Sequence, residues 1–278
     1  MTTTISGTVG VTFPAGGVGN SASAVVGIND TQTLVNKTLT NPTINGTSSD
    51  ANWKYRISRF DFEGANGDLV TYDYVNGPIG LQSGAALSTT QVKYGTTSLA
   101  CTGGTTGSQQ LVTNVSLALG TSPFCIEGWC YATSFTNVTF PGIFDYAIST
   151  TSRISIYFSS ATTIVVRVNS TSNTLTLSTI GISLNTWFHF AVERSSTATN
   201  GLKFYVNGTL AGTYTFATPI LSTWTLYVGS EQTGLALQGY LDDFRLTAAV
   251  VYGNTFTPPT AALPVAPYVV QGMGPVGL

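Results

Sequence analysis

From Trp53 onward, the sequence is made of short stretches in which apolar and polar residues alternate, and turn residues separate these stretches. Alternation with a period of two is typical of β-strands with one buried face, whereas an amphipathic helix has a period of 3.6. The only plausible helical turn, at 247–251, is short. Many short strands with turns between them predict an antiparallel β-sandwich.

The expected strands are joined by recognisable turns. Asn207 and Gly208 form a two-residue hairpin signal, and 159–161 joins two further strands. The strands are expected at 55–62, 93–101 (a turn followed by a strand), 124–132, 153–158, 163–168, 187–194, 202–208, 210–216, 225–229 and 241–246.

Composition limits the class of protein and its partners. Hydrophobic residues make up 42% of the 278 residues, enough for a sizeable core, but charged residues make up only 8%, against roughly 25% in an average domain. Thr, Ser, Asn and Gly must therefore keep the chain in solution, as in many β-rich extracellular and virion proteins. The net charge is −2, so nucleic acid is not an expected partner. We expect neither a secretory signal nor membrane insertion, because no basic-then-apolar start and no continuous apolar span occurs.

The chain divides into three parts by composition and residue pattern. Residues 1–52 are rich in Gly, Thr, Val and Asn, and Phe13 is the only aromatic residue between 8 and 49. Such a segment cannot build its own core, so it is either disordered or an extended arm that joins copies or anchors the chain elsewhere. Residues 53–264 form the β domain. Residues 265–278 continue a tail punctuated by Pro and Gly and are expected to be an extended strap.

The stretch 239–246 contains an apparent conflict. Strict alternation places Asp242 on the same face as Tyr240, Phe244 and Leu246. A carboxylate in line with core-facing residues needs a cation, a hydrogen-bond donor or a metal ion. The cysteines Cys101, Cys125 and Cys130 are too few and too unevenly spaced for a disulfide framework or a zinc site, so buried free thiols are expected. Cys125 and Cys130 lie five residues apart and should point to opposite faces of a strand.

Six segments in this order resemble the laminin-G-like, concanavalin A-like jelly-roll family, in the form common on bacteriophage structural proteins. They are 60–64 (FDFEG), 93–99 (KYGTTSL), 124–129 (FCIEGW), 185–191 (NTWFHFA), 203–208 (KFYVNG) and 239–246 (GYLDDFRL) followed by 254–259 (NTFTPP). The match runs through most of 53–264. The resemblance implies an all-β jelly-roll sandwich preceded by the N-terminal arm.

The resemblance also implies a calcium site, where the opening acidic turn meets the closing Asp pair. Here that means Asp61, Glu63, Asp242 and Asp243, with Asp68 as a further ligand. Calcium takes 6 to 8 oxygen ligands, and this group can supply some of them. The alternative is that Asp242 pairs with an arginine, Arg59 or Arg245, or accepts hydrogen bonds from backbone N–H groups.

Some members of the family are glycoside hydrolases, but catalysis is not expected here. Such enzymes need two carboxylates about 5–9 Å apart, and no predicted strand away from the opening turn carries two acids on one face. His189 stands between Phe188 and Phe190 and is interpreted as a packing residue. We therefore expect a protein that is not an enzyme.

Carbohydrate binding is the functional class that the composition of the domain favours. Sugars are held by aromatic faces and planar polar groups, and the chain offers Trp129, Tyr131, Tyr146, Tyr205, Trp224 and Tyr227. Trp129, Trp187 and Phe204 fall in family strands and are assigned to packing. Tyr146 and Trp224 lie near predicted loops and are the candidates for an exposed glycan-binding surface. An exposed aromatic can equally be covered by a neighbouring subunit.

Residues 31–44 (TQTLVNKTLTNPTI) resemble a short segment that recurs in bacteriophage tail-fibre and other virion proteins; a disordered Thr-rich linker is the alternative. The resemblance predicts a virion protein of the tail-fibre or spike type, joined to other virion proteins by its arm, homotrimeric, and in contact with host-surface glycan. A capsid decoration or head-fibre protein with a purely structural domain is the second hypothesis.

Overall fold

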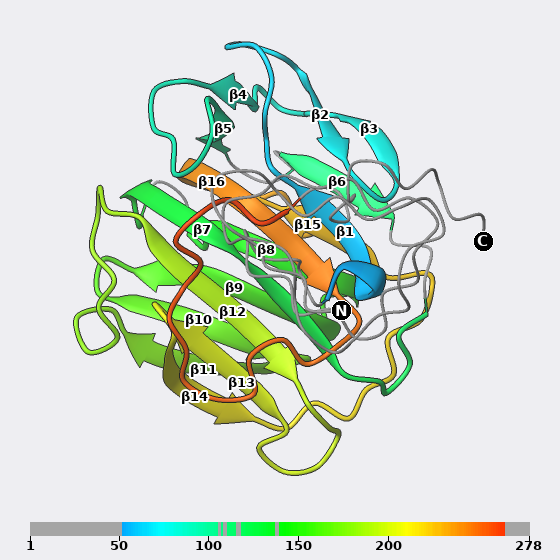
Figure 1. Cartoon of the computed structure of the whole chain (residues 1–278). Coiled ribbons are helices and arrows are strands. Elements are labelled where there is room, and N and C mark those ends of the chain that lie inside the picture. The colour runs from blue at the N-terminus through cyan, green and yellow to red at the C-terminus, as the bar shows by residue number, and fades with distance from the viewer. Residues whose placement is uncertain (1–51, 105–106, 108–109, 115–117, 137–138, 265–278) are drawn as a thin grey trace, which may run out of the picture. The chain divides into compact units, whose positions relative to one another are not determined.

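The computed structural model describes residues 52–104, 107, 110–114, 118–136 and 139–264. Two antiparallel sheets form the body of this part (Figure 1). In the larger sheet the order is β14 (Thr209–Tyr214), β13 (Leu202–Val206), β12 (Phe188–Arg194), β7 (Phe124–Ser134), β16 (Ala236–Thr247), β5 (Ser98–Gly104) and β4 (Ala86–Ser88), and β1 (Arg56–Phe60) also pairs with β16. In the smaller sheet it is β11 (Thr171–Thr176), β10 (Thr163–Val168), β9 (Ser152–Ser160), β8 (Gly142–Ser149), β15 (Thr225–Val228) and β6 (Leu111–Asn114). A hairpin of β2 (Val70–Asp73) and β3 (Gly77–Gly80) and a 3₁₀ turn, η1 (Trp53–Tyr55), complete the described elements.

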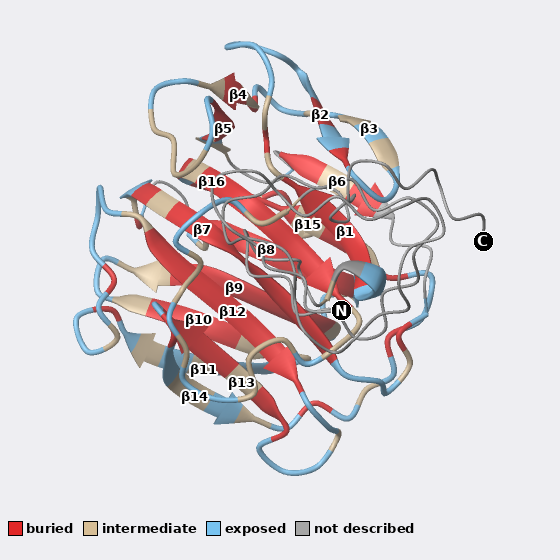
Figure 2. Cartoon of the chain, in the orientation of Figure 1, coloured by how far each residue is buried: buried red, intermediate tan, exposed pale blue. Residues whose placement is uncertain are grey.

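The core lies between the two sheets. Phe144 of β8 contacts Phe190 of β12 and Phe244 of β16, with ring centroids 5.9 and 6.3 Å apart. Figure 2 shows that buried residues dominate the central strands, whereas exposed residues gather on β14 and on the β2–β3 hairpin. The all-β jelly-roll sandwich expected from the sequence is therefore confirmed.

A β-bulge in β16 resolves the apparent conflict at Asp242 in the stretch 239–246. Asp242 pairs with Trp129 and Arg245 with Glu127, so two residues of β16 face Gly128 of β7. Asp243 is the extra residue and adopts a left-handed conformation, with φ 53°. A bulge shifts the side-chain phase by one. Asp242 therefore leaves the core face that alternation assigned to it, while Phe244 and Leu246 keep that face.

Every predicted strand overlaps a described one, but six described strands were not predicted: β2, β3, β4, β6, β8 and β11. The helical turn considered at 247–251 is wrong, because these residues end β16 and then form bends. The prediction for the cysteines is confirmed: all three are buried free thiols, and Cys130 joins the core between the sheets whereas Cys125 packs on the outer side. The predicted arm (1–52, apart from Asn52) and the predicted strap (265–278) lie outside the described residues.

Residues 248–264, which we call the closing segment, leave the end of β16 and run across the outer face of the larger sheet (Figure 1). Hydrogen bonds hold it there at several strands. Lys203 Nζ of β13 donates to the carbonyl of Gly253 at 2.5 Å, and the N–H of Phe256 donates to the carbonyl of Gly208. The closing segment thus covers one part of the outer face and leaves another part open.

Candidate functional site

Three half-buried aromatic side chains lie in a row across the open part of the larger sheet. Tyr131 of β7 stands between Trp187, just before β12, and Tyr240 of β16. The ring centroids are 5.5 Å apart for Tyr131 and Trp187, and 5.9 Å apart for Tyr131 and Tyr240. We call these three residues the aromatic row. Because the rings come from adjacent strands, the sheet itself fixes their spacing.

Gly239 allows Tyr240 to take its place in the row. A Cβ atom at Gly239 would collide with the carbonyl oxygen of Tyr131. The register of β16 against β7 shifts at this point, where Gln238 pairs with Ser134 and Gly239 with Ala132. Only glycine permits so close an approach of two backbones. The side chains of Asn185 and Gln238 are exposed, each two residues along the chain from a member of the row.

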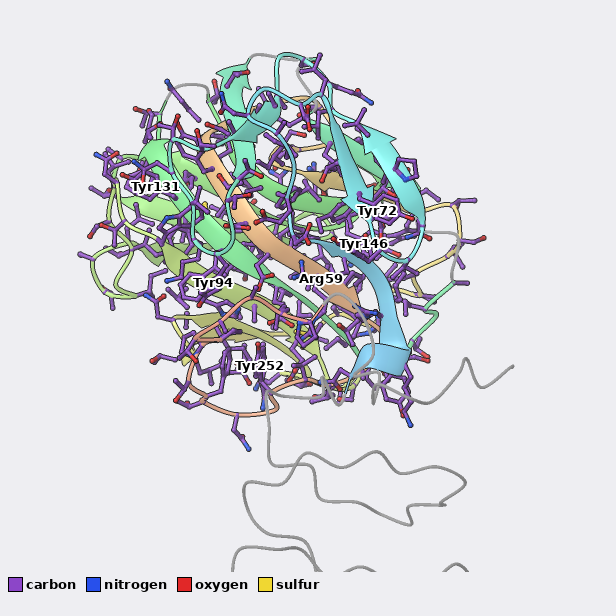
Figure 3. The ribbon with its side chains drawn as sticks, turned by 45° about the horizontal axis from the view of Figure 1, so that its top comes forward. Arg59, Tyr72, Tyr94, Tyr131, Tyr146 and Tyr252 are labelled. Carbon is purple, nitrogen blue, oxygen red and sulfur yellow. The ribbon has the colours of Figure 1, made fainter. Side chains whose placement is uncertain are left out.

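Beyond the aromatic row, the same face of β7 carries Trp129, which is 6% exposed. The ammonium of Lys93 lies 3.7 Å from the centre of its ring, in a cation–π contact. Tyr94 contacts the same ring from the side, with centroids 6.0 Å apart. Figure 3 shows Tyr131, Tyr94 and Tyr252 following one another down this face. Trp129 thus links the open part of the face to the covered part.

Under the closing segment, the face carries charged side chains instead of open aromatic ones. Glu127 of β7 is fully buried; Arg245 Nε donates to its Oε1 at 2.9 Å, and Tyr252 of the closing segment donates to its Oε2. His189 Nε2 lies 3.4 Å from the same carboxylate. Burial alone would raise the pKa of Glu127, but Arg245, His189 and Tyr252 outweigh it and lower that pKa to about 2.

Glu193 of β12 fixes the start of the closing segment. Its carboxylate accepts hydrogen bonds from three successive backbone N–H groups: Val251 at 2.7 Å, Tyr252 at 2.8 Å and Gly253 at 2.8 Å. Three consecutive N–H groups pointing at one carboxylate form an anion-binding turn. The buried carboxylate of Glu193 therefore has its hydrogen-bond donors from the segment that covers it.

The predicted acidic residues come together at the far end of the open part. Asp61, Glu63, Asp242 and Asp243 line a cleft of about 330 Å³, together with Arg59, Tyr94 and residues 262–264. We call it the acidic cleft. The four acids that the family resemblance groups together therefore line one cleft, and the bulge turns Asp242 toward it.

These carboxylates are largely occupied by other partners. Asp243 forms an ion pair with Arg59 and accepts the N–H of Leu263. Glu63 accepts the N–H of Thr96 at both oxygens and also binds the hydroxyl of this residue. Asp61 accepts the N–H of Glu63 and bonds the hydroxyl of Tyr74.

Asp242 accepts the backbone N–H groups of Lys93 (2.9 Å) and Tyr94 (3.1 Å) at its Oδ2, while its Oδ1 is buried without a partner. Of the alternatives considered for Asp242, hydrogen bonding to backbone N–H groups is thus the one observed. The arginines pair with other acids: Arg59 with Asp243, and Arg245 with Glu127.

The donor set does not fit a calcium ion. Calcium requires several uncommitted oxygens, but a guanidinium lies on Asp243 and both oxygens of Glu63 hold the turn at Thr96. Within the described ranges, no group of three His, Cys, Asp or Glu side chains is arranged to hold a metal. Asp68, the further ligand considered, does not line the cleft; it accepts the N–H of Ala65.

The expectation that Tyr146 and Trp224 are exposed is wrong. Tyr146 is 0% and Trp224 1% exposed, and their rings pack edge to face inside the core at 5.5 Å. Tyr146 lies on β8, which was not predicted, and shares its inward face with Phe144. Trp224 contacts Phe216 in the same cluster. Tyr146 is thus enclosed in the core, and Trp224, although it lines a cleft of about 240 Å³, is almost fully covered.

Trp187 and Tyr240 of the aromatic row were missed. The sequence alone assigns Trp187 to packing, and strict alternation places Tyr240 on the face of Phe244 because it takes no account of the bulge. His189, by contrast, packs as expected: it is 1% exposed and contacts the ring of Trp129 at 5.2 Å. No helix in the part of the chain that the structure describes is long and apolar enough to cross a bilayer.

Solved structures with a similar fold include proteins that bind or cleave carbohydrate. Domain 4 of AbnA, a GH43 extracellular arabinanase from Geobacillus stearothermophilus solved with arabinotriose, has a TM-score of 0.52 at 14% identity, over 71% of this chain and 94% of that one. The binding domain of botulinum neurotoxin DC in complex with SialylT gives 0.51 at 13%, over 71% and 48%. Trypanosoma rangeli sialidase gives 0.51 at 12%, over 78% and 34%. At these identities the similarity establishes the shared fold.

None of the curated proteins matches the chain. Residues 103–251, which are more than half of the sequence, match the family described as the concanavalin A-like lectin/glucanases superfamily, Laminin_G_3. This range includes the whole of β7, β12 and β16, and with them the three residues of the aromatic row. The chain therefore belongs to the concanavalin A-like lectin/glucanases superfamily.

Proposed function

We propose that this domain binds a glycan, and that the sugar rings stack on the aromatic row of Tyr131, Trp187 and Tyr240. The observation that carries the proposal is the geometry of the row: three half-buried rings from β7, β16 and the residue just before β12, with centroids 5.5 and 5.9 Å apart and planes tilted by 55° and 72°. Aromatic faces offer the apolar face of a sugar a large, rigid surface, and nearby polar groups bind its hydroxyls. Asn185 and Gln238 are exposed beside the row and supply such groups.

Binding without catalysis is the reading we prefer. The buried acids on this face already have partners: Glu127 is held by Arg245 and Tyr252, and Glu193 by three backbone N–H groups. A general acid or nucleophile for glycoside cleavage has to reach the glycosidic bond. Neither of these carboxylates is exposed on the open part of the face.

The test is a glycan array followed by calorimetric titration of the best ligand. Trp187→Ala and Tyr240→Ala should each weaken binding about tenfold, because each removes one stacking ring. Tyr72→Ala is the matched control, since Tyr72 is 50% exposed on β2, away from the row (Figure 3). Equal affinity of the wild type, Trp187→Ala and Tyr240→Ala would reject the row as the binding surface.

We further propose that the domain is displayed on a bacteriophage particle, as part of a tail fibre or spike that contacts host-surface glycan. The likeness of 31–44 to a tail-fibre segment supports this, as does the low charge content of 8%. The arm 1–52 would join the chain to other virion proteins and hold three copies together. Sedimentation of the full chain should then give the mass of a trimer; a monomer at micromolar concentration would contradict it.

A capsid decoration or head-fibre protein is the second candidate, and the same resemblance supports it, because the segment also occurs in other virion proteins. Labelling intact particles with an antibody against the domain, followed by electron microscopy, separates the two. Label at the tail tip is expected for the host-attachment role. Label spread over the capsid in high copy number would favour the decoration role.

A further inference from the structure

The three rings of the aromatic row do not lie in one plane. The ring of Trp187 is inclined by 55° to that of Tyr131, and the ring of Tyr240 is inclined by 72° to it. Adjacent strands of a sheet are rotated by about 20–25°, so the twist of the sheet contributes only part of these angles. All three rings are half-buried, and an inclined neighbour covers at most one of the two faces of a ring. The row therefore offers faces that point in different directions.

Packing holds the rings at these angles. Tyr131 contacts a ring on each side, at centroid distances of 5.5 and 5.9 Å. The backbone of β16 at Gly239 lies so close to that of β7 that no Cβ atom fits between them. Each ring thus limits the rotation of its neighbour, and a surface that already has its bound shape loses little freedom when a ligand binds. The shape of the row can therefore select the shape of the ligand.

The side chains become shorter beyond Tyr240. In the register of the sheet, Tyr240 pairs with Ala100 of β5, and Ala100 pairs with Ala86 of β4. These strands follow β16 toward the edge of the larger sheet (Figure 1), and directly paired residues of antiparallel strands share one face. A straight ligand that continued along the row would lose contact at the alanines, whereas a ligand that bends toward the sheet keeps it.

Uncharged polar side chains accompany the row. They are Asn185, Thr133 and Gln238, each two residues along the chain from a member of the row, and all three are exposed. The hydroxyl of Thr133 donates to the carbonyl of Gln238 at 3.0 Å. Amide and hydroxyl groups both donate and accept hydrogen bonds, as sugar hydroxyls do. These groups can therefore bind the edges of sugars whose faces lie on the rings.

Glycans differ in the angle between successive sugars. In β-1,4-linked glucose, the sugar rings lie in nearly parallel planes, and the chain is a flat ribbon. In α-1,4-linked glucose, each linkage turns the next ring, and the chain curves. A flat ribbon can stack on only one of several inclined aromatic faces, whereas a curved chain can stack on two or three. Each additional stacked ring adds to the affinity.

We propose that the aromatic row selects a curved glycan, in which each linkage turns the next sugar, over a flat ribbon of the same sugar. This inference rests on the proposed glycan-binding function and names the ligand class for the same site. It assigns the specificity to the angles between Tyr131 and its two neighbouring rings, since specificity is a difference between two affinities.

The experiment titrates the full chain by calorimetry with tetramers that differ only in linkage. Maltotetraose (α-1,4) is compared with cellotetraose (β-1,4), and α-1,2-linked with β-1,4-linked mannotetraose. The curved tetramer of a pair should bind about tenfold more tightly, because it gains at least one stacked ring. The double variant Trp187→Ala/Tyr240→Ala keeps one ring of the row and should reduce this ratio to within about twofold. Tyr72→Ala, away from the row, should keep the ratio of the wild type.

Each other result decides against the proposal. Equal affinity for both tetramers of a pair, or tighter binding of the flat one, overturns the inference but leaves the row as a glycan site. A preference for the curved tetramer that persists in the double variant has its origin outside the row. Absence of binding to all four tetramers also overturns the inference, and the proposed function fails with it only if the glycan array is blank as well. The wild-type comparison needs no variant, so it remains decisive if the double variant does not fold.

Discussion

The outer face of the larger sheet has a covered part and an open part, built on the same strands. In the covered part, β7 and β12 present Glu127 and Glu193, and the closing segment supplies the donors that these buried acids need. In the open part, β7 presents Tyr131 between Trp187 and Tyr240, and all three rings are only half-buried. The difference shows how one face serves two purposes: its charges fasten the chain to itself, and its rings remain available for a ligand.

The first test of this difference removes the charge of Glu127, which is fully buried in the covered part. Glu127→Gln should lower the free energy of unfolding by about 3–5 kcal/mol, because it removes the carboxylate charge that pairs with the buried guanidinium of Arg245. Urea denaturation followed by tryptophan fluorescence measures the change. Glu63→Gln, at a half-buried position, should cost much less. Equal losses for the two variants would mean that the Glu127–Arg245 pair does not hold the covered part.

Acid should weaken the same pair in the wild type. The folded-state pKa of Glu127, about 2, lies below its ordinary value of 4.5. The stabilisation that Glu127 contributes is therefore complete above about pH 4.5 and is lost as the pH falls toward 2. The urea midpoint of the wild type should fall across this window more steeply than that of Glu127→Gln. Parallel curves would contradict the depressed pKa.

Glu193 provides a narrower test, because it touches the closing segment through backbone N–H groups alone. Glu193→Gln should cost about 1.5–3 kcal/mol, the range for hydrogen bonds to a charged group. Hydrogen exchange should accelerate at Val251, Tyr252 and Gly253 and stay slow at β7. Unchanged protection of these three amides would show that the closing segment is held without Glu193.

Substitution of Gly239 tests the open part of the face. Gly239→Ala should destabilise the fold by about 1–3 kcal/mol, since its Cβ would meet the carbonyl of Tyr131 and cannot be relieved by a side-chain rotation. Displacement of Tyr240 from Tyr131 should also weaken glycan binding, which none of the covered-part variants is expected to do. Calorimetric titration beside Glu193→Gln makes this distinction. A Gly239→Ala protein with full affinity would show that the row tolerates a shift.

The sequence could predict the sandwich because several of its strands alternate apolar residues with polar ones, as Ile154, Ser155 and Ile156 do in β9. It could not predict β8, where buried residues occupy both faces: Phe144 faces the core while Asp145 is buried against Arg153 on the other side. With β8 unrecognised, Tyr146 was placed near a loop. The acidic cleft was foreseeable as a group of residues from the family resemblance. The aromatic row was not, because a single extra residue, Asp243, changes the phase of β16, and the sequence gives no sign of the bulge.

The smallest effect on stability is expected for Asp242, which lies between the covered part and the open part of the face. Its folded-state pKa of about 7 lies above the ordinary value of 3.8, because burial disfavours the charged form. The folded protein therefore holds a proton that the unfolded chain releases, so the contribution of Asp242 to stability falls as the pH rises from about 4 to 7 and is constant above 7. Asp242→Asn removes this dependence, and its amide oxygen can still accept the N–H groups of Lys93 and Tyr94. The free energy of unfolding of the variant, relative to that of the wild type, should therefore increase as the pH is raised from 5 to 8. Urea denaturation of both proteins at each pH measures the increase. If the difference between the two proteins is the same at both pH values, Asp242 is ionised throughout, and the open part then carries a full negative charge beside its rings.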